Sequence, residues 1–430
     1  MDGTNRSETD VMTQPPTIRP ETPPTPQPPP SGTGKYRVLF LHPGSIPPSS
    51  DPQRNLLFHL SRYCEGDIVT TRWDLPEDFE TPRRALTFDT LGDFRYHATR
   101  STRIPGLFRT AWHLVYFLAT GLRLCRTRGP YDVIIAYGPF TLAFVGWVLK
   151  RLTGTKLVIE VPGPPTEGFT YEPGFTSKVK LRVARWLAPF LLRRADATRL
   201  YYAWQLDDLP GGPFPPAYVF PDFVLIGGTG AAPAQARAPA DTASAERFIL
   251  FLGSPFSRKG VDVLIKAFLR ISDRHPDVTL RVIGHCPDRG PYEQMAAGNP
   301  RVLFSPGIPN EEAMKLMADC TLFALPSRME GVPRVLIEAM AAGKPVVSTR
   351  ASGIPALVDH GHTGLLSDVD DVRGLADNMD RLLSDPGFAR QLAEAGHRYV
   401  FEELTEERFV ERNREMLDSL VGRPAARPNP

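Results

Sequence analysis

Cysteine is scarce in this chain of 430 residues, which contains only four. They stand at positions 64, 125, 286 and 320, so no two are close enough in sequence to form a cysteine metal motif or a disulfide framework. This spacing argues against a small disulfide-stabilised fold and against a cysteine-ligated metal. It favours a reducing compartment, and we therefore expect a cytoplasmic protein.

Long hydrophobic runs are also missing. The longest apolar stretches, residues 110–122 and 137–149, are about 13 residues each, whereas a helix that spans a bilayer needs about 20. Residues 1–34 are polar, carry nine prolines between positions 15 and 30, and lack the apolar core of a secretory signal. We expect 1–34 and 422–430 to be disordered tails and expect no transmembrane segment.

Neither sign of charge dominates, since the net charge is +2, but the balance changes along the chain. Residues 35–225 hold 24 Lys and Arg against 17 Asp and Glu, whereas residues 226–430 hold 24 against 27. The basic excess gathers at 100–128 and 177–199, beside Trp112, Tyr116, Trp186 and Phe190. Such stretches fit equally well a surface that contacts the anionic inner leaflet of a membrane and a solvated helix face packed on a sheet. Nucleic acid is not expected as a partner, because no reading motif accompanies them.

The length and the order of apolar runs predict two α/β domains. Strands are predicted at 37–42, 67–71, 131–138, 156–163, 197–201 and 218–221, and then at 248–253, 279–284, 302–305, 321–325 and 345–348. Helical segments lie between most of them, which predicts two doubly wound parallel sheets of Rossmann-like type facing a cleft. The expected domains are 35–226 and 247–395, joined by a Gly-, Ala- and Pro-rich linker at 227–246 and followed by a helix at 396–421.

The segment Glu-Gly-Val-Pro-Arg-Val-Leu-Ile-Glu, residues 330–338, is the most informative in the sequence. Pro333 suits the first turn of a helix and Gly343 suits its end, so a helix is expected at 333–342. The apolar positions Val332, Val335, Leu336, Ala339 and Met340 fall on one face at the helical period. Glu330 and Glu338 are then free to bind a ligand, and the helix N-terminus between them is a seat for a diphosphate. The pattern therefore indicates a sugar-nucleotide site.

This segment resembles the Glu, seven residues, Glu motif of the retaining glycosyltransferases of family 4, which have the GT-B fold. The resemblance continues upstream in Phe-Leu-Gly-Ser-Pro-Phe-Ser-Arg-Lys-Gly-Val-Asp-Val-Leu-Ile at 251–265. It continues downstream in Gly-Lys-Pro-Val-Val-Ser-Thr at 343–349 and Gly-His-Thr-Gly-Leu-Leu at 361–366. The second half of the chain therefore resembles the donor-binding domain of that family, while the first half resembles it less.

The resemblance implies a role for each matching position. Glu330 would hold hydroxyls of the transferred sugar, Glu338 the ribose hydroxyls, and Lys259 the diphosphate. Many members have arginine directly after the strand glycine, but this chain has Ser254, so Arg258 is expected to be the second cation. The remaining donor-binding positions are expected to be Gly253, Ser254, Gly331, Val332, Pro333, Val335 and Leu336.

The first half departs from the family pattern around the expected cleft. Of a glycine pair that often follows the first strand, only Gly44 is present, and a later strand ends in Glu160-Val161-Pro162-Gly163, with Pro162 where relatives often have histidine. His42, Gly44 and Gly163 remain cleft candidates, although a packed or surface histidine explains His42 equally well. No catalytic base is assigned, because the resemblance implies a front-face reaction in which the leaving phosphate helps to deprotonate the acceptor.

The resemblance implies a nucleotide-sugar co-substrate, no other cofactor and no metal. Asp368-Val369-Asp370 spells an Asp-x-Asp string that binds metal in a different glycosyltransferase fold, but here it precedes a helix expected near Val372, where Asp is favoured as a cap. Asp262 is likewise expected to be a helix cap, and His285 a residue of a loop at a strand end.

The resemblance thus implies a retaining, metal-independent hexosyltransferase, whose helix at 396–421 would cross back to the first domain. Its acceptor is expected to be a glycan or a lipid-linked glycan, in the synthesis of cell-surface polysaccharide or glycolipid. Two other functions stay open. One is a sugar-nucleotide epimerase of the same architecture, and the other is a catalytically weak nucleotide-binding scaffold.

Overall fold

The computed structural model describes residues 34–43, 55–71, 90–99, 106–166, 175–225 and 246–422. Gly44 lies outside the described residues. So do the expected tails and linker, apart from Gly34, Glu246 and Gly422. Among the described residues, no helix combines the length and apolar character that crossing a membrane requires.

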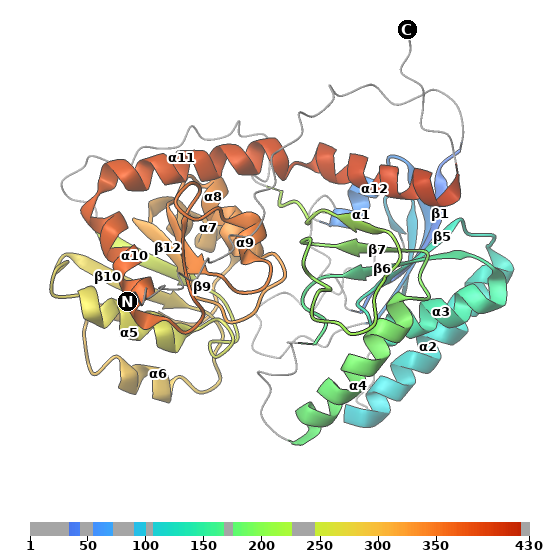
Figure 1. Cartoon of the computed structure of the whole chain (residues 1–430), viewed down its shortest axis with the longest axis horizontal. Helices are drawn as coiled ribbons and strands as arrows, with labels where there is room; N and C mark the ends of the chain where they lie inside the picture. Colours follow the sequence, from blue (N-terminus) through green and yellow to red (C-terminus); the bar gives the residue numbers. More distant parts are fainter. Residues whose placement is uncertain are drawn as a thin grey trace, which may run out of the picture. The chain divides into compact units, whose positions relative to one another are not determined.

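The first sheet is formed by residues 36–219. Its strands are β1 (Tyr36–Leu41), β2 (Cys64–Thr70), β3 (Thr90–Leu91), β4 (Phe94–Ala98), β5 (Val133–Tyr137), β6 (Lys156–Val161), β7 (Ala197–Leu200) and β8 (Ala217–Val219). They lie in the order β3-β4-β2-β1-β5-β6-β7-β8, and every pair except β3 with β4 is parallel. Figure 1 labels β1, β5, β6 and β7 of this sheet. β3 and β4 were not predicted, because β3 has two residues and β4 (Phe-Arg-Tyr-His-Ala) contains two basic residues and shows no run of apolar ones.

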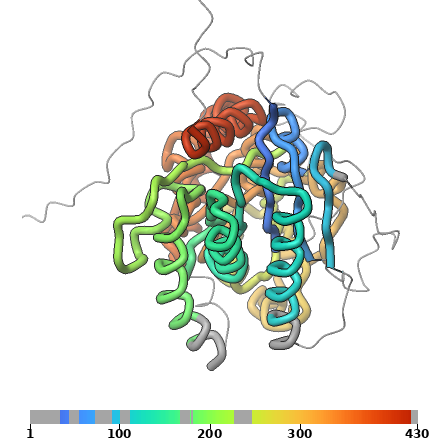
Figure 2. The backbone as a smooth tube through the Cα atoms, turned by 90° about the vertical axis from the view of Figure 1, so that its right-hand side faces the viewer, coloured from blue at the N-terminus to red at the C-terminus, as the bar shows by residue number. Residues whose placement is uncertain are grey.

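The helices within this half of the described chain are α1 (Leu56–Leu60), α2 (Gly106–Thr127), α3 (Thr141–Thr153) and α4 (Phe175–Leu192). α2, α3 and α4 lie side by side on one face, as Figure 2 shows in teal and green. Their apolar sides cover Leu39, Ile134 and Ile159 of the central strands. The opposite face of the sheet is covered by α1 and by α12 (Glu406–Val421). Because both faces are buried, the sequences of these strands are nearly continuous apolar runs.

The second sheet is formed by residues 247–367. Its strands are β9 (Arg247–Leu252), β10 (Val278–Ile283), β11 (Val302–Ser305), β12 (Leu322–Leu325), β13 (Val346–Thr349) and β14 (Leu365–Ser367). All are parallel, in the order β11-β10-β9-β12-β13-β14. β14 has three residues and is not among the predicted ranges, although Asp368 was expected to follow a strand. Both sheets have the predicted doubly wound form.

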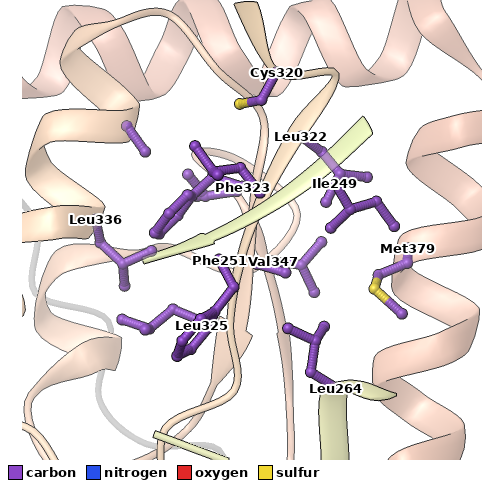
Figure 3. Packing of buried hydrophobic residues seen from close by; sticks show 14 of the residues in the cluster. Ile249, Phe251, Leu264, Cys320, Leu322, Phe323, Leu325, Leu336, Val347 and Met379 are labelled. Atoms are coloured by element: carbon purple, nitrogen blue, oxygen red, sulfur yellow. The ribbon is translucent and has the colours of Figure 1, made fainter. Parts of the chain in front are cut away.

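The helices of the second half are α5 (Val261–Ile271), α6 (Gly290–Met295), α7 (Asn310–Asp319), α8 (Arg334–Ala341), α9 (Ile354–Leu357), α10 (Val372–Ser384) and α11 (Pro386–Glu403). They bury a core around Phe251 and Phe323. Figure 3 shows Leu336 of α8 on one side of the strands, with Leu264 of α5 and Met379 of α10 on the other. This packing fixes the position of α8 beside β12 and β13.

The chain ends in two helices where the sequence predicted one. α11 stops at Glu403 and α12 starts at Glu406, because the Thr405 side chain accepts a hydrogen bond from the Arg408 N–H and caps the new helix. α12 packs on the first sheet, where Phe409 contacts Phe220 and Phe223 with ring centroids 6.3 and 5.2 Å apart. The last helix of the chain therefore completes the core of the first half.

Candidate functional site

The loop after β12 leads into α8 and carries the first glutamate of the predicted pair. α8 runs from Arg334 to Ala341, and Pro333 lies at the cap position just before it rather than in the first turn. At the other end Gly343 has φ of 65°, which favours glycine, and its N–H donates to Met340 O at 3.0 Å. The Lys344 N–H donates to Ala339 O at 3.0 Å and completes this helix stop.

The buried face of α8 differs in part from the prediction. Leu336, Ala339 and Met340 are fully buried, but Ile337 is buried too, whereas Val332 and Val335 are only half-buried. Val332 and Val335 thus keep the exposure that a donor-binding position needs. The Leu336 side chain lies in the core (Figure 3), and the expected contact of this position with the donor stays a prediction.

Lys259 and Glu330 form a direct ion pair. The Lys259 ammonium donates to Glu330 Oε1, the Ser327 hydroxyl donates to the same oxygen at 2.7 Å, and the two charged side chains are 12% and 10% exposed. The Gly353 N–H donates to the Glu330 carbonyl at 3.2 Å and holds the main chain of the loop. Two residues assigned to separate parts of the donor are therefore in contact with each other, at the carboxyl edge of the second sheet.

Glu338 lies half-buried on α8. Burial raises the pKa of its carboxyl group above the ordinary value, and the Arg334 charge partly opposes this rise. Within the described ranges, the carboxylate makes no hydrogen bond or ion pair. The Arg334 and Val335 N–H groups at the start of α8 likewise donate to no described residue. These groups form a set of vacant polar contacts next to the Glu330 loop.

The remaining predicted donor positions lie in the loop after β9. The Ser254 hydroxyl donates to His285 O at 2.8 Å, and Gly253 packs against the aliphatic part of Lys259. The Arg258 carbonyl oxygen accepts a hydrogen bond from the Arg328 main-chain N–H at 2.9 Å. The Nε of the Arg258 guanidinium is buried and has no hydrogen-bond partner among the described residues. No ion pair links Arg258 to Glu330 or Glu338 in the described part of the chain. Its expected role as the second cation therefore stays a prediction.

Arg328 is a residue that the sequence reasoning missed. Its guanidinium makes two hydrogen bonds to Asp262, at 2.9 and 2.7 Å, and one to Asp370 at 2.7 Å. Burial opposes ionisation of Asp262, but the hydrogen bonds from Arg328 outweigh it and lower the pKa of this carboxyl. Arg328 thus connects the loops before α5, α8 and α10. The available signal was its place two residues before Glu330.

This arrangement corrects the interpretation of two aspartates. Asp262 does not cap α5, whose cap position is Gly260, and instead pairs with Arg328. Asp370 also pairs with Arg328, and the cap of α10 is Asp371, whose side chain accepts the Gly374 N–H. The helix start near Val372 is as predicted. Among the described residues, no group of three or more His, Cys, Asp or Glu side chains could hold a metal ion.

One segment of the first half, after β6, reaches the Glu330 loop. A Cβ atom placed on Gly331 would lie 2.0 Å from Pro162 O, and one placed on Gly163 would lie 3.6 Å from the Gly331 nitrogen, so the two backbones touch. Gly163 is therefore beside the Glu330 loop. His42 stands at the end of β1 with its ring centroid 4.6 Å from that of Tyr137, which supports a packed histidine.

Two family models match the chain. One, described as "Glycosyl transferases group 1", matches residues 234–399, and the other, "Glycosyl transferase 4-like domain", matches residues 61–217. The chain belongs to glycosyltransferase family 4. The family predicted from residues 251–366 is thereby confirmed.

Among curated relatives, this glycosyltransferase is 33% identical over 180 residues to the GDP-mannose-dependent alpha-(1-6)-phosphatidylinositol monomannoside mannosyltransferase of Mycolicibacterium smegmatis. That match covers 40% of this chain and 46% of the relative. The chain spans about half the length of the curated relatives it matches.

Solved structures resemble nearly the whole glycosyltransferase. The sucrose-phosphate synthase of Thermosynechococcus elongatus has a TM-score of 0.73 at 19% identity, covering 90% of this chain and 100% of that one. HepE of Anabaena, solved in complex with UDP and glucose, has a TM-score of 0.63 at 18% identity, covering 89% and 100%. At this identity the likeness shows the fold, and the predicted GT-B fold class is confirmed.

Proposed function

We propose that this family 4 glycosyltransferase moves a sugar, with retention of configuration, from a nucleoside-diphosphate sugar to a glycan or lipid-linked glycan acceptor. The observation that carries the proposal is the Lys259–Glu330 ion pair, largely buried and placed beside the start of α8. A cation, a carboxylate and vacant N–H groups together match the phosphates and hydroxyls of a sugar nucleotide.

Each group has a distinct task in this proposal. Lys259 binds the diphosphate, Glu330 orients the transferred sugar, and Glu338 accepts hydrogen bonds from the ribose. The half-buried Glu338 carboxylate gains partners when ribose binds, which offsets the cost of its burial. A solved structure of the same fold was obtained with UDP and glucose, which supports a nucleotide-sugar donor.

The reaction would depend mainly on positioning and charge. As the glycosidic bond breaks, negative charge grows on the diphosphate, and the nearby Lys259 ammonium stabilises it. Glu330 is held by both Lys259 and Ser327, so it is placed to orient a sugar rather than to attack one. A front-face reaction, in which the leaving phosphate takes the acceptor proton, requires no protein nucleophile.

We further propose that donor binding requires no metal ion. The charge of the diphosphate would be met by Lys259 and by the N–H groups at the start of α8. This part of the proposal is tested by performing every donor experiment both in EDTA and with added Mg²⁺. Equal donor affinity in the two conditions is expected, and binding that needs Mg²⁺ would contradict it.

The acceptor proposal includes contact with a membrane. Trp112 of α2 and Trp186 of α4 are 46% and 67% exposed, and Arg182 and Arg185 are exposed beside Trp186. Exposed indole rings next to cations suit the surface of an anionic bilayer. A curated relative is named for a phosphatidylinositol-linked acceptor, which supports a lipid-linked substrate here.

The donor site is tested by thermal unfolding with a panel of UDP-, GDP- and ADP-sugars. A ligand of the folded state raises its stability by RT ln(1 + [L]/Kd), so one sugar nucleotide should raise Tm selectively. Lys259→Ala should weaken the binding of that donor by about 1–3 kcal/mol. Lys266→Ala removes the same charge from the exposed surface of α5 and should leave donor binding unchanged. The donor assignment is wrong if Lys259→Ala and wild type bind alike.

The reaction type is tested with the donor alone. Slow hydrolysis uses water as acceptor, so retention predicts that the released sugar first carries the donor's anomeric configuration, as NMR would show before mutarotation. The inverted anomer would contradict retention. Conversion of the free donor to an isomeric sugar nucleotide would instead indicate the epimerase, and donor binding without any turnover would indicate the scaffold.

A further inference from the structure

A pocket beside the Glu330 loop contains none of the donor residues named above. Its walls come from the segments after β6, β7 and β13 and include Pro165, Tyr202, Trp204, Gln205, Asp208 and Ser352. Its cavity volume is about 40 Å³, and the cavity opens to solvent. A ligand would therefore bind across its mouth, where Trp204 and Asp208 are exposed, rather than inside it.

Gln205 braces the pocket. Its side chain is 4% exposed, accepts the Tyr201 N–H at 2.7 Å, and donates to Val161 O at 2.6 Å and Gly163 O at 2.9 Å. These bonds tie the loop after β7 to the segment after β6. The pocket wall is therefore built before any ligand arrives.

An aromatic pair forms the surface of the pocket. The rings of Tyr202 and Trp204 have centroids 5.3 Å apart at 52°, and Trp204 remains 40% exposed. The Trp204 indole N–H donates to Ser352 O at 3.1 Å, which fixes the orientation of the ring. Asp208 is exposed at the same pocket, and its carboxylate has no hydrogen bond or ion pair with any residue that the structure describes.

This combination favours a neutral sugar. The C–H face of a pyranose ring is apolar and can stack on an indole, while its hydroxyls can donate to a carboxylate. The pocket is lined by one carboxylate and by no lysine or arginine, so a phosphate or another anion would be repelled. The same charge disfavours the nucleoside diphosphate of the donor.

The pocket is also connected to the Glu330 loop. A Cβ atom on Gly353 would lie 2.6 Å from Tyr202 Cδ1, and the Gly353 N–H donates to the Glu330 carbonyl at 3.2 Å. Only Gly353 therefore separates Tyr202 from the main chain of Glu330. We propose that this pocket binds a sugar ring of the acceptor by stacking on Trp204 and hydrogen bonding to Asp208. The proposal rests on the proposed glycosyltransferase function and names its acceptor subsite.

The test is saturation-transfer NMR with three probes, the methyl α-pyranosides of glucose, mannose and galactose. At least one should bind the wild-type chain, and Trp204→Ala and Asp208→Ala should each raise its Kd by about tenfold. Trp204→Phe removes the N–H that donates to Ser352 but keeps an aromatic face. Because the sugar ring is proposed to stack on that face, this variant should retain most of the binding. Asp207→Ala changes the neighbouring exposed aspartate, which does not line the pocket, and should bind as wild type does.

Three results would overturn the proposal: no probe binds wild type, Trp204→Ala binds normally, or Trp204→Phe is as weak as Trp204→Ala. Asp208 is exposed, so its replacement tests the pocket even if Trp204→Ala unfolds the chain. The Tm rise caused by the sugar nucleotide should be unchanged in Asp208→Ala. If wild type binds a donor but no probe binds through Trp204, the acceptor subsite alone is wrong. If no donor binds, the proposed function is wrong.

Discussion

At the proposed donor site, the carboxyl group of Glu338 is half-buried and has no hydrogen bond or ion pair with any described residue. The motif alone located Glu338. It could not predict the raised pKa of this residue, because burial depends on what packs around α8. Lys259 and Glu330 were also found from the sequence, whereas their contact joins residues 71 positions apart.

Glu338→Gln should weaken donor binding by about 1–3 kcal/mol and, without donor, raise Tm at neutral pH. The pKa of Glu338 is higher in the folded protein, so its protonated form favours folding. The stabilisation by protonated Glu338 is present at acidic pH and is lost as pH rises through the raised pKa. At neutral pH the buried carboxylate therefore destabilises the folded protein, and glutamine removes this destabilisation. Tm measured from acidic to neutral pH tests the effect.

The control for this change is Glu312→Gln, on the exposed surface of α7. It should alter neither donor affinity nor the pH dependence of Tm. A lower Tm for unliganded Glu338→Gln at neutral pH would contradict the account of its burial, and an unchanged donor affinity would contradict its role at the ribose.

At the scale of single elements, Asp67 shows how strand β2 is held. Its fully buried carboxylate accepts hydrogen bonds from Tyr131 at 2.5 Å and Arg128 at 3.0 Å, and contacts His97 of β4 at 2.7 Å. Burial opposes its ionisation, but the hydrogen bonds from His97, Tyr131 and Arg128 prevail and lower the pKa of Asp67 to about 2. One side chain thus joins β2 to β4 and to the end of α2.

Asp67→Ala should reduce the free energy of unfolding by about 3 kcal/mol, since it leaves buried donors without their acceptor. Urea unfolding measures this loss. Because the pKa of Asp67 is lowered in the folded protein, its contribution is complete above the ordinary aspartate pKa and falls as pH drops toward 2. Asp93→Ala removes an exposed ion pair with Lys35 and should cost less than about 1 kcal/mol. Equal losses in both variants would contradict this explanation.

α4 carries the second prediction at this scale. If its exposed face contacts an anionic membrane, Arg182→Ala/Arg185→Ala should weaken binding to phosphatidylglycerol vesicles by about 2 kcal/mol, at about 1 kcal/mol for each charge. Cosedimentation at low and high salt measures this, and neutral phosphatidylcholine vesicles should bind little.

The matched control is Arg373→Ala/Arg390→Ala, which removes two exposed arginines from α10 and α11. It should leave vesicle binding unchanged. Equal binding of wild type and the α4 variant, or binding that salt does not weaken, would favour the other interpretation of α4 as an ordinary solvated helix.

At the scale of the whole described chain, distant segments complete each other's packing. Phe409, Met416 and Leu417 of α12 lie in one cluster with Tyr36 and other residues of the first strands. Glu406 pairs with His59 at 2.8 Å and also with Arg62. At the site itself, the backbones of Pro162 and Gly331 touch, and Gly331 also packs against Gly353. The Glu330 loop therefore depends on both halves of the chain.

Gly331→Ala should weaken donor binding by about 1–3 kcal/mol, because its methyl group would lie 2.0 Å from Pro162 O and force the loops apart. Gly163 lies across the same contact, but the methyl group of Gly163→Ala would lie 3.6 Å from Gly331, which is an ordinary contact distance. This variant should therefore lose much less donor affinity than Gly331→Ala. The donor-induced rise in Tm compares the two. Equal effects would show that this contact does not position the loop.

The family, the two doubly wound sheets and the positions of Lys259, Glu330 and Glu338 follow from the amino-acid sequence, because local runs and the order of short motifs encode them. Tertiary structure alone decided the Lys259–Glu330 contact, the place of Arg328 between Asp262 and Asp370, and the burial of Leu336. It also decided that Tyr202 lies against Gly353. These features join residues far apart in the chain, and only the packing of the sheets and helices sets which side chains meet and which are removed from water.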